Sequence, residues 1–137
     1  MDEDCLVDCD KCNGKTQREI RIEVSNFPQV LMVQLKRFKT VITNKGKLKK
    51  VKIKTDVHFE KTLTLNGHNY DLVSIVNHFG EINSGHYTAF GKVLEEMENS
   101  QEKQIWYEFD DHKVKELKVQ GDVSSSAAYL LFYTKAE

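Results

Sequence analysis

Apolar and polar residues alternate over many short stretches of this chain, a pattern typical of β-strands that bury one face. Residues 18–24 place isoleucine or valine at every second position between charged side chains, which predicts a half-buried strand. Residues 30–38 are more continuously apolar, and this favours a strand in the centre of a sheet. Residues 48–59 alternate lysines with apolar residues. They predict a strand with a solvated lysine face, and an acidic partner for these lysines is the alternative.

The second half of the chain continues the β pattern. Asn66-Gly67 is a strong hairpin signal, and residues 44–47 contain a second turn signal. The polar, acidic residues 94–103 predict a loop or a short helix. Further strands are predicted at residues 70–79, 86–93, 105–109, 113–117 and 128–134.

Composition narrows the classes of function. The 137 residues suffice for one domain or part of one, and 20 basic residues nearly cancel 21 acidic ones. A net charge of −1 gives no general reason to expect nucleic-acid or membrane binding. No apolar run reaches the length of a membrane span, and the acidic N-terminus does not match a secretory signal peptide. Three cysteines, an odd number, argue against a disulfide framework. We therefore expect a reducing intracellular location, in the cytoplasm, the nucleus or both.

His86 has the most suggestive chemical setting in the chain. It follows Gly85, which lets a backbone or a substrate approach closely, and it precedes residues that favour a strand. An imidazole on such a rigid element is suited to taking a thiol proton near neutral pH. A structural or surface histidine is the alternative interpretation.

Asp110 and Asp111 follow in a second aromatic segment, Trp106-Tyr107-Glu108-Phe109. A carboxylate that binds the second ring nitrogen of a histidine fixes its tautomer and orientation. The pair could instead be only a turn between two strands, because aspartate is common in turns.

Cys9-Asp10-Lys11-Cys12 has the spacing of a zinc knuckle, in which a tight turn presents two thiolates to one metal ion. A closed structural site needs four ligands, and Cys5 is a candidate third. A redox pair is the alternative, but such a pair normally precedes a helix, and the residues after Cys12 are predicted to be a strand. The residues therefore favour a zinc knuckle or a vestigial turn of that kind over a redox pair.

Taken together, the ordered motifs of this chain resemble the C-terminal part of the catalytic domain of ubiquitin-specific proteases, the papain-like cysteine deubiquitinases. The resemblance extends from about residue 9 to residue 134, and six motifs in the right order are far more specific than any one alone. The motifs are Cys9-x-x-Cys12-x-x-Lys15, Phe27-Pro28-x-x-Leu31 to Leu35-Lys36-Arg37-Phe38, the segment 50–65, Tyr70-x-Leu72 to Val76-x-His78-x-Gly80 with Gly85-His86-Tyr87-x-Ala89-Phe90, Trp106-Tyr107-x-Phe109-Asp110-Asp111-x-x-Val114, and Ala128-Tyr129-x-Leu131-Phe132-Tyr133.

The resemblance implies an α+β, papain-like family fold with fingers, palm and thumb, of which this chain would be the mostly antiparallel β part. Residues 1–137 would be a partial catalytic domain, with a remnant of the fingers at 9–26 and the palm at 27–134. The thumb, which carries the cysteine box with the nucleophile, has no counterpart here. The missing N-terminal half of the catalytic domain, which contains the thumb, is therefore an expected partner.

By the same resemblance His86 is the general base, Asp110 orients it and Asp111 assists. Gly85 and Tyr87 would line the cleft for the ubiquitin tail. The expected partners are ubiquitin or a ubiquitin-like modifier and its conjugates, with neither nucleic acid nor membrane. Catalysis would need no cofactor.

The implied reaction is thiol-dependent hydrolysis of the bond after the C-terminal glycine of ubiquitin. Because no nucleophilic cysteine box is present, we expect the isolated chain to be inactive. At Cys9 and Cys12, a structural zinc would have only half of its ligands.

Two other functions fit parts of the sequence. A truncated relative could bind ubiquitin or a ubiquitin-like protein without cutting it, as a non-catalytic module. A zinc-ribbon protein that binds nucleic acid is disfavoured by the near-zero net charge.

Overall fold

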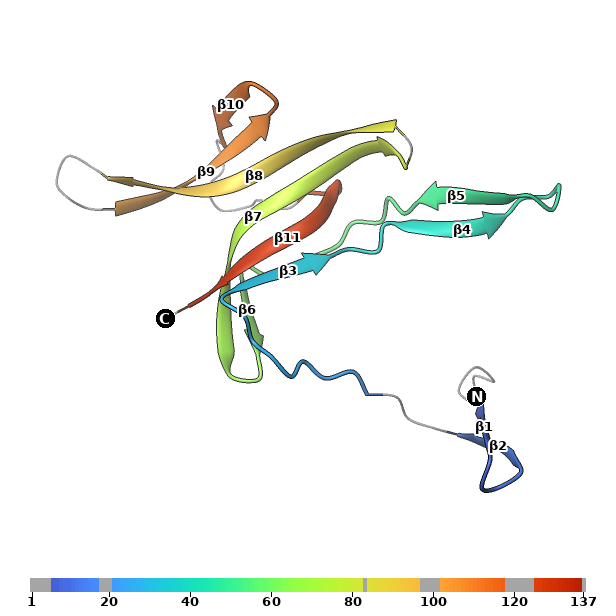
Figure 1. Ribbon diagram of the computed structural model, residues 1–137. Helices are drawn as coiled ribbons and strands as arrows, with labels where there is room; N and C mark the ends of the chain where they lie inside the picture. The colour runs from blue at the N-terminus through green and yellow to red at the C-terminus, as the bar shows by residue number, and fades with distance from the viewer. Residues whose placement is uncertain (1–5, 18–20, 83, 97–101, 118–124, 137) are drawn as a thin grey trace.

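The computed structural model describes residues 6–17, 21–82, 84–96, 102–117 and 125–136 (Figure 1). These residues form β-strands and turns and contain no helix. The strands are β1 (Leu6–Cys9), β2 (Gly14–Gln17), β3 (Val30–Gln34), β4 (Phe38–Ile42), β5 (Leu48–Lys52), β6 (Thr62–Leu65), β7 (His68–Glu81), β8 (Ser84–Glu96), β9 (Glu102–Asp110), β10 (Lys113–Glu116) and β11 (Ala128–Lys135).

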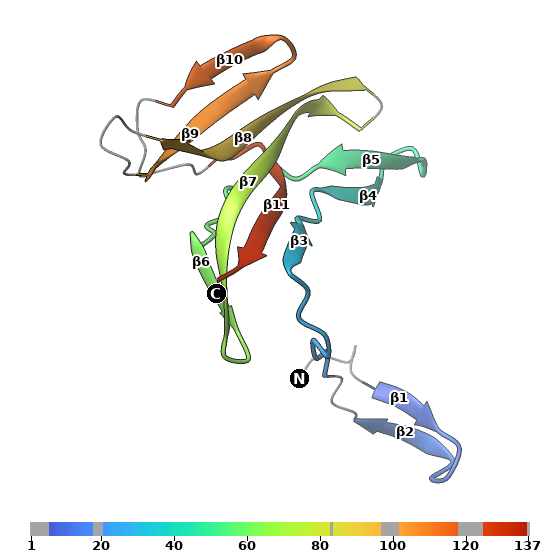
Figure 2. The same ribbon diagram turned by 60° about the vertical axis from the view of Figure 1, so that its left-hand side comes forward.

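A seven-stranded sheet makes up most of the structure. Its order is β10-β9-β8-β7-β11-β3, with β6 paired to β7, and every described pairing is antiparallel. The prediction of a mostly antiparallel β chain is therefore confirmed. The hairpins β1–β2 and β4–β5 form two separate small sheets, and both extend away from the main sheet in the two views (Figures 1 and 2).

Two predicted turns are confirmed. Asn66 and Gly67 join β6 to β7 with φ angles of 46° and 81°. These left-handed conformations suit asparagine and glycine and match the right-handed twist of the strands. Gly46, with φ 71°, closes the turn between β4 and β5.

The core lies at the middle of the main sheet. Aromatic and aliphatic side chains from β7, β9 and β11 form one buried cluster: Tyr70, Leu72, Ile75, Trp106, Ala128, Leu131 and Tyr133. The two buried tyrosines keep their hydroxyls bonded, because Tyr70 donates to the Pro28 carbonyl and Tyr133 to the Glu60 carbonyl, each at 2.8 Å. Each large side chain buried in this way stabilises the fold by roughly 1.5–3 kcal/mol, so this cluster holds the strands that carry the candidate site.

The prediction of one central strand over 30–38 is wrong. β3 stops at Gln34 and lies at the edge of the sheet, and Phe38 begins β4 in a different sheet. The chain leaves the main sheet at Arg37, whose buried guanidinium Nε donates to the Ala128 carbonyl at 2.9 Å. The apolar run does not show which strands are neighbours, and on this edge strand two of its residues, Val30 and Met32, are 54% and 56% exposed.

Two other predicted strands are wrong or shorter than expected. Arg21 to Val24 has no regular structure, and Ile22 is 94% exposed, while residues 18–20 lie outside the described part. Among the described residues no strand pairs with this segment. Without a neighbouring strand, its backbone N–H and C=O groups make no ladder hydrogen bonds and are hydrated by water. The strand predicted at 48–59 ends at Lys52.

The loop or short helix predicted at 94–103 is wrong at both ends. Leu94–Glu96 continues β8 and Glu102–Lys103 begins β9, with Glu96 opposite Glu102. Residues 97–101 lie outside the described part. In the part of the chain that the structure describes, no helix is long and apolar enough to cross a membrane.

Candidate active site

The backbone of two neighbouring strands, β8 and β9, brings His86 and Asp110 together. His86 lies near the start of β8, and Asp110 is the last residue of β9. Ala89 pairs with Phe109, so the even-numbered residues 86 and 88 of β8 share a face with residues 108 and 110 of β9. The antiparallel register therefore places the histidine and the aspartate on one face, although 24 positions separate them in the sequence.

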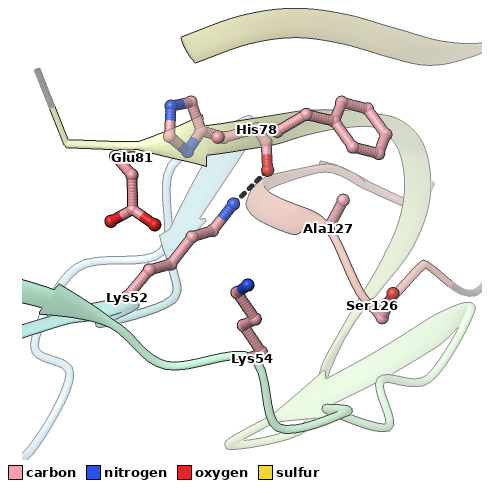
Figure 3. Close-up of a pocket in the computed structure, with 8 residues that line it drawn as sticks. Lys52, Lys54, His78, Glu81, Ser126 and Ala127 are labelled. Atoms are coloured by element: carbon pink, nitrogen blue, oxygen red, sulfur yellow. Dashed lines mark hydrogen bonds between the residues drawn. The ribbon is translucent and has the colours of Figure 1, made fainter. Parts of the chain in front are cut away.

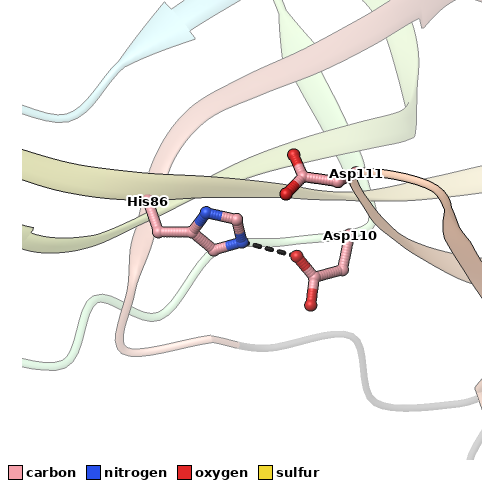
Figure 4. A group of neighbouring side chains, drawn as sticks. All are labelled: His86, Asp110 and Asp111. Atoms are coloured by element: carbon pink, nitrogen blue, oxygen red, sulfur yellow. Dashed lines mark hydrogen bonds and ion pairs between the residues drawn. The ribbon is translucent and has the colours of Figure 1, made fainter.

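The two side chains are hydrogen bonded. His86 Nε2 lies 2.5 Å from Asp110 Oδ1, as Figure 4 shows. Their side chains are 48% and 42% exposed, so the pair lies at the surface. Nδ1 of His86 makes no hydrogen bond to any described residue and is the ring nitrogen left to exchange a proton with another group.

Asp111 lies beside this pair, in the turn between β9 and β10. Its backbone is left-handed, with φ 50°, a conformation that aspartate tolerates better than most residues. The turn interpretation of this segment is thus correct, but the same turn ends β9 at the place where Asp110 meets His86. A turn and a histidine partner are therefore not alternatives here.

The carboxylates raise the pKa of His86 above its ordinary value of 6.5. The hydrogen bond from His86 Nε2 to Asp110 is the largest cause. The negative charges of Asp110 and Asp111 add to it, while partial desolvation opposes it. The site therefore favours the protonated ring, which suits a group that must hold a proton taken from a nucleophile.

The same three side chains could offer ligands to a metal ion, since one ligand atom from each lies within 4.8 Å of the others. However, the 2.5 Å between Nε2 and Oδ1 is the length of a direct hydrogen bond. Two ligands of one zinc, each about 2.0–2.2 Å from the ion, lie farther apart than this. The arrangement is that of a hydrogen-bonded pair.

Gly85 is required by close packing in the β7–β8 hairpin. A Cβ at this position would lie 2.2 Å from His78 Nε2 and 2.7 Å from the Phe79 carbonyl oxygen. Gly80 is its partner across the hairpin and has φ 93°. The glycine next to His86 thus allows the two strands and the His78 ring to approach closely.

Tyr87 lies on the opposite face of β8 from His86, because neighbouring residues of a strand alternate. Its side chain is 55% exposed, and its ring lies 4.7 Å from the His78 ring. No functional role was predicted for His78 from the sequence. The structure buries it between the rings of Phe38, Tyr87 and Tyr129, and its Nδ1 has no partner among the described residues. Burial lowers the pKa of His78, and the charge of Lys52 adds to this effect. Only the apolar and aromatic residues around position 78 could have signalled its burial.

A cavity of about 260 Å³ lies next to His78, at the base of the β4–β5 hairpin (Figure 3). Lys52, Lys54, Glu81 and Ser126 are among its lining residues. Lys52 Nζ donates a hydrogen bond to the His78 carbonyl oxygen. This bond fixes the base of the hairpin to β7, close to the strands of the candidate site.

The predicted zinc ligands lie in another part of the chain. Cys9 ends β1, Cys12 follows in the turn, and the Cys12 N–H donates to the Cys9 carbonyl at 3.2 Å. Asn13 has a left-handed backbone with φ 49°, so the two cysteines belong to one tight hairpin turn. The only cluster of three or more metal-ligand side chains among the described residues is the one at His86. Cys9 and Cys12 thus lie on one turn with the spacing of a zinc knuckle, and Cys5 lies outside the described residues.

Comparison with protein families gives a match over almost the whole chain. The model described as "Ubiquitin carboxyl-terminal hydrolase" matches residues 4–133. Ubiquitin carboxyl-terminal hydrolase 5 of Arabidopsis thaliana is 33% identical over 134 residues, which are 93% of this chain and 14% of the relative. Ubiquitin carboxyl-terminal hydrolase cyk-3 of Caenorhabditis elegans is 28% identical over 98% of this chain and 11% of the relative. The chain thus spans less than a sixth of the length of these curated relatives.

Solved structures give the same similarity. The SAGA DUB module Ubp8/Sgf11/Sus1/Sgf73 bound to monoubiquitin contains a chain that matches 98% of this one with a TM-score of 0.72 and 29% identity. The same module bound to ubiquitin aldehyde matches 98% of this chain with a TM-score of 0.71 and 29% identity. This chain covers 29% and 30% of those two chains.

Proposed function

Because this chain belongs to the ubiquitin carboxyl-terminal hydrolase family, we propose that it supplies the general base of a cysteine-type deubiquitinase. The reaction is hydrolysis of the bond after the C-terminal glycine of ubiquitin. The observation that carries the proposal is the hydrogen bond between His86 Nε2 and Asp110, which leaves Nδ1 for the nucleophile. Ubiquitin as the substrate is supported by the similarity to structures of a DUB module bound to monoubiquitin and to ubiquitin aldehyde.

Each member of the site has its own task in this proposal. His86 Nδ1 takes the proton of a cysteine thiol, and Asp110 keeps Nε2 protonated and the ring oriented. Asp111 adds negative charge that stabilises the imidazolium formed in this step. Thiolate is the reactive form of cysteine, so proton removal generates the nucleophile.

The reaction then proceeds in two halves. The thiolate forms a bond to the glycine carbonyl carbon, and as the C–N bond breaks, the leaving amine receives the proton from His86. Water attacks the resulting thioester while His86 takes its proton. The C–S bond breaks, the ubiquitin carboxylate is released and the thiol is restored.

The nucleophile comes from outside the described residues in this proposal. Cys9 and Cys12 belong to the β1–β2 hairpin, which stands away from β8 and β9 in both views (Figures 1 and 2). A cysteine must lie within hydrogen-bond reach of the base to be activated by it. Residues 27–134 would form the palm and residues 9–26 part of the fingers, with the cysteine box on a thumb supplied by another segment. The isolated chain would then be inactive.

The ubiquitin tail would lie against the β7–β8 hairpin. Gly85 and Tyr87 share the face of β8 opposite His86. On that face Gly85 leaves room for the His78 ring, and Tyr87 offers an exposed ring. A structural zinc at Cys9 and Cys12 would need two further ligands from outside the described residues.

The test is covalent labelling of the longest native product that contains this chain, captured from its source cells. A ubiquitin derivative with a thiol-reactive C-terminus should add one ubiquitin mass at a cysteine outside this chain. The His86→Ala variant should label far more slowly, because its thiol is no longer deprotonated by a neighbouring base. As a matched control, His112→Ala removes an exposed histidine from the nearby turn and should label at the wild-type rate. Equal labelling of the His86→Ala variant would contradict the proposal.

A non-catalytic ubiquitin-binding module is the second candidate, favoured by the separation of the β1–β2 hairpin, to which the described cysteines belong, from β8 in Figures 1 and 2. It predicts that the captured product binds ubiquitin, with or without His86, and that no cysteine is labelled. The same labelling experiment therefore distinguishes the two functions.

A further inference from the structure

The β4–β5 hairpin and its flanks, residues 36–54, concentrate positive charge and are called here the lysine hairpin. This segment contains eight lysines and one arginine and no acidic residue, whereas the rest of the chain holds all 21 acidic residues. A near-zero net charge for the whole chain therefore hides a strongly basic projection on an acidic body. Charge separated in this way attracts a partner of opposite sign to one place.

The lysines point from both faces of the hairpin. The register pairs Lys39 with Val51, Thr40 with Lys50 and Val41 with Lys49. Lys49 and Lys50 are neighbours on β5, so their side chains lie on opposite faces. The positive charge thus surrounds a narrow two-stranded ribbon instead of covering one flat side.

The tip of the hairpin adds an apolar contact. Ile42 and Leu48 lie directly opposite each other at the ends of β4 and β5, and each is 74% exposed. Lys47 and Lys49 flank Leu48 in the sequence. A ligand for this surface should carry negative charge together with at least one aliphatic group.

No described carboxylate forms an ion pair with any lysine of the hairpin. The base is fixed by the hydrogen bond from Lys52 to the His78 carbonyl oxygen. Burial lowers the pKa of Lys52, and the nearby charges of Arg37 and Lys54 lower it further. The hairpin is thus anchored at its base, where the negative charge of Glu81 opposes the lowering of the Lys52 pKa, and its exposed lysines beyond the base have no ion-pair partner among the described residues.

We propose that the lysine hairpin is a docking site for an extended acidic polypeptide segment that contains aliphatic residues. The carboxylates of such a segment would pair with Lys47, Lys49 and Lys50, and its aliphatic side chains would cover Ile42 and Leu48. This binding is independent of hydrolysis at His86, and so it stands or falls separately from the proposed deubiquitinase function.

Two other kinds of anionic partner fit the hairpin less well. A planar membrane would meet only one side or one end of the ribbon. A five-residue strand is roughly 17 Å long. Lysines on the other side or at the far end would therefore lie farther from the membrane surface than the Debye length of about 8 Å. A flexible polypeptide can wrap the ribbon and meet both faces. Single-stranded nucleic acid needs exposed aromatic rings for stacking, but Phe38, the one aromatic residue of the hairpin, packs against His78 and Tyr129.

The test measures fluorescence anisotropy of a labelled peptide that repeats Glu-Ser-Glu-Leu three times, titrated with the 137-residue chain. Binding should weaken as salt rises, and a peptide with glutamine in place of glutamate should not bind. Substitution of Lys47, Lys49 and Lys50 by glutamine should reduce affinity roughly tenfold, since each exposed ion pair contributes up to about fivefold. The matched control replaces the exposed Lys61, Lys113 and Lys115 by glutamine, which removes the same charge and should change affinity less than about twofold.

Two further variants separate charge from fold and from apolar contact. Arginine at positions 47, 49 and 50 keeps the charge and should keep the binding. Ile42→Ser with Leu48→Ser should weaken binding of this peptide but not of a peptide in which serine replaces leucine. Equal losses in the two glutamine variants, or tighter binding of phosphatidylserine vesicles or single-stranded RNA than of the acidic peptide, would overturn the proposal.

Discussion

Gly85→Ala is the substitution that most sharply tests the link between packing and the candidate site. The added Cβ would lie 2.2 Å from His78 Nε2 and 2.7 Å from the Phe79 carbonyl oxygen, both inside van der Waals contact. His78 is buried at 3% exposure among aromatic rings, so its imidazole has little room to rotate away. The carbonyl belongs to the paired backbone of β7 and can move only if the strands separate.

The expected cost follows from these contacts. One extra methyl group in a closely packed place destabilises a fold by about 1–3 kcal/mol. The small gain that alanine normally has over glycine in a strand, about 0.5–1 kcal/mol, offsets part of this. We expect a net loss of roughly 1–2 kcal/mol in the free energy of unfolding, together with displacement of His86 from Asp110.

Urea denaturation of the chain and an NMR pH titration of the His86 ring are the two assays. The transition midpoint should fall, and the pKa of His86 should move back toward its ordinary value because its hydrogen bond to Asp110 is weakened. Gly14→Ala is the matched control, since its Cβ would meet nothing closer than 3.8 Å. The His78→Ala background should reduce the cost of Gly85→Ala, since it removes the nearer of the two clashes. If Gly85→Ala and Gly14→Ala had the same midpoint and the same His86 titration, the reasoning would be refuted.

Three further predictions test the site and the core. The pKa of His86, read by NMR, should lie above 6.5 and fall in Asp110→Asn. Because the pKa of His86 is raised in the folded state, its pair with Asp110 should stabilise the fold at pH values below the ordinary pKa and lose this effect as pH rises through the raised value. A pH-independent difference in unfolding midpoint between the wild type and Asp110→Asn would contradict this. Leu131→Ala removes a buried side chain from the core cluster and should lower the free energy of unfolding by about 2–5 kcal/mol in urea denaturation; a loss below about 1 kcal/mol would contradict the assigned burial. A hydrogen bond to Glu95 raises the pKa of Tyr107 to about 12, and ultraviolet titration of Glu95→Gln should return that pKa toward 10.0, whereas an unchanged titration would exclude this cause.

Alternation in the sequence predicted the strands of the central hairpins because their partners follow one another in the chain. β7 and β8 are joined by a short turn, and Asn66-Gly67 determines where β7 begins. The pattern failed at residues 21–24, where alternation predicted a strand, and at residues 30–38, where a continuous apolar run predicted one central strand. In both places the structure depends on which distant segment lies alongside. β11, near the end of the sequence, separates β3 from β7, and no local pattern near residue 30 contains that information.

The candidate site also combines features that the local sequence predicted with features that depend on distant segments. The motifs around His86 and Asp110 indicated that these residues act together, but not which ring nitrogen binds the carboxylate. That choice depends on the register between β8 and β9. His78 was not identified because its burial depends on Phe38, Tyr87 and Tyr129, which come from three separate segments.

The most direct test of the central claim is the rate at which the full-length native product hydrolyses a ubiquitin C-terminal fluorogenic substrate, compared with its His86→Ala variant. The account predicts that kcat falls by roughly 10²–10⁴, while affinity for ubiquitin stays within a few fold and the His112→Ala control keeps the wild-type rate. Hydrolysis by the His86→Ala variant at a rate close to wild type would show that His86 is not the general base and would contradict the account.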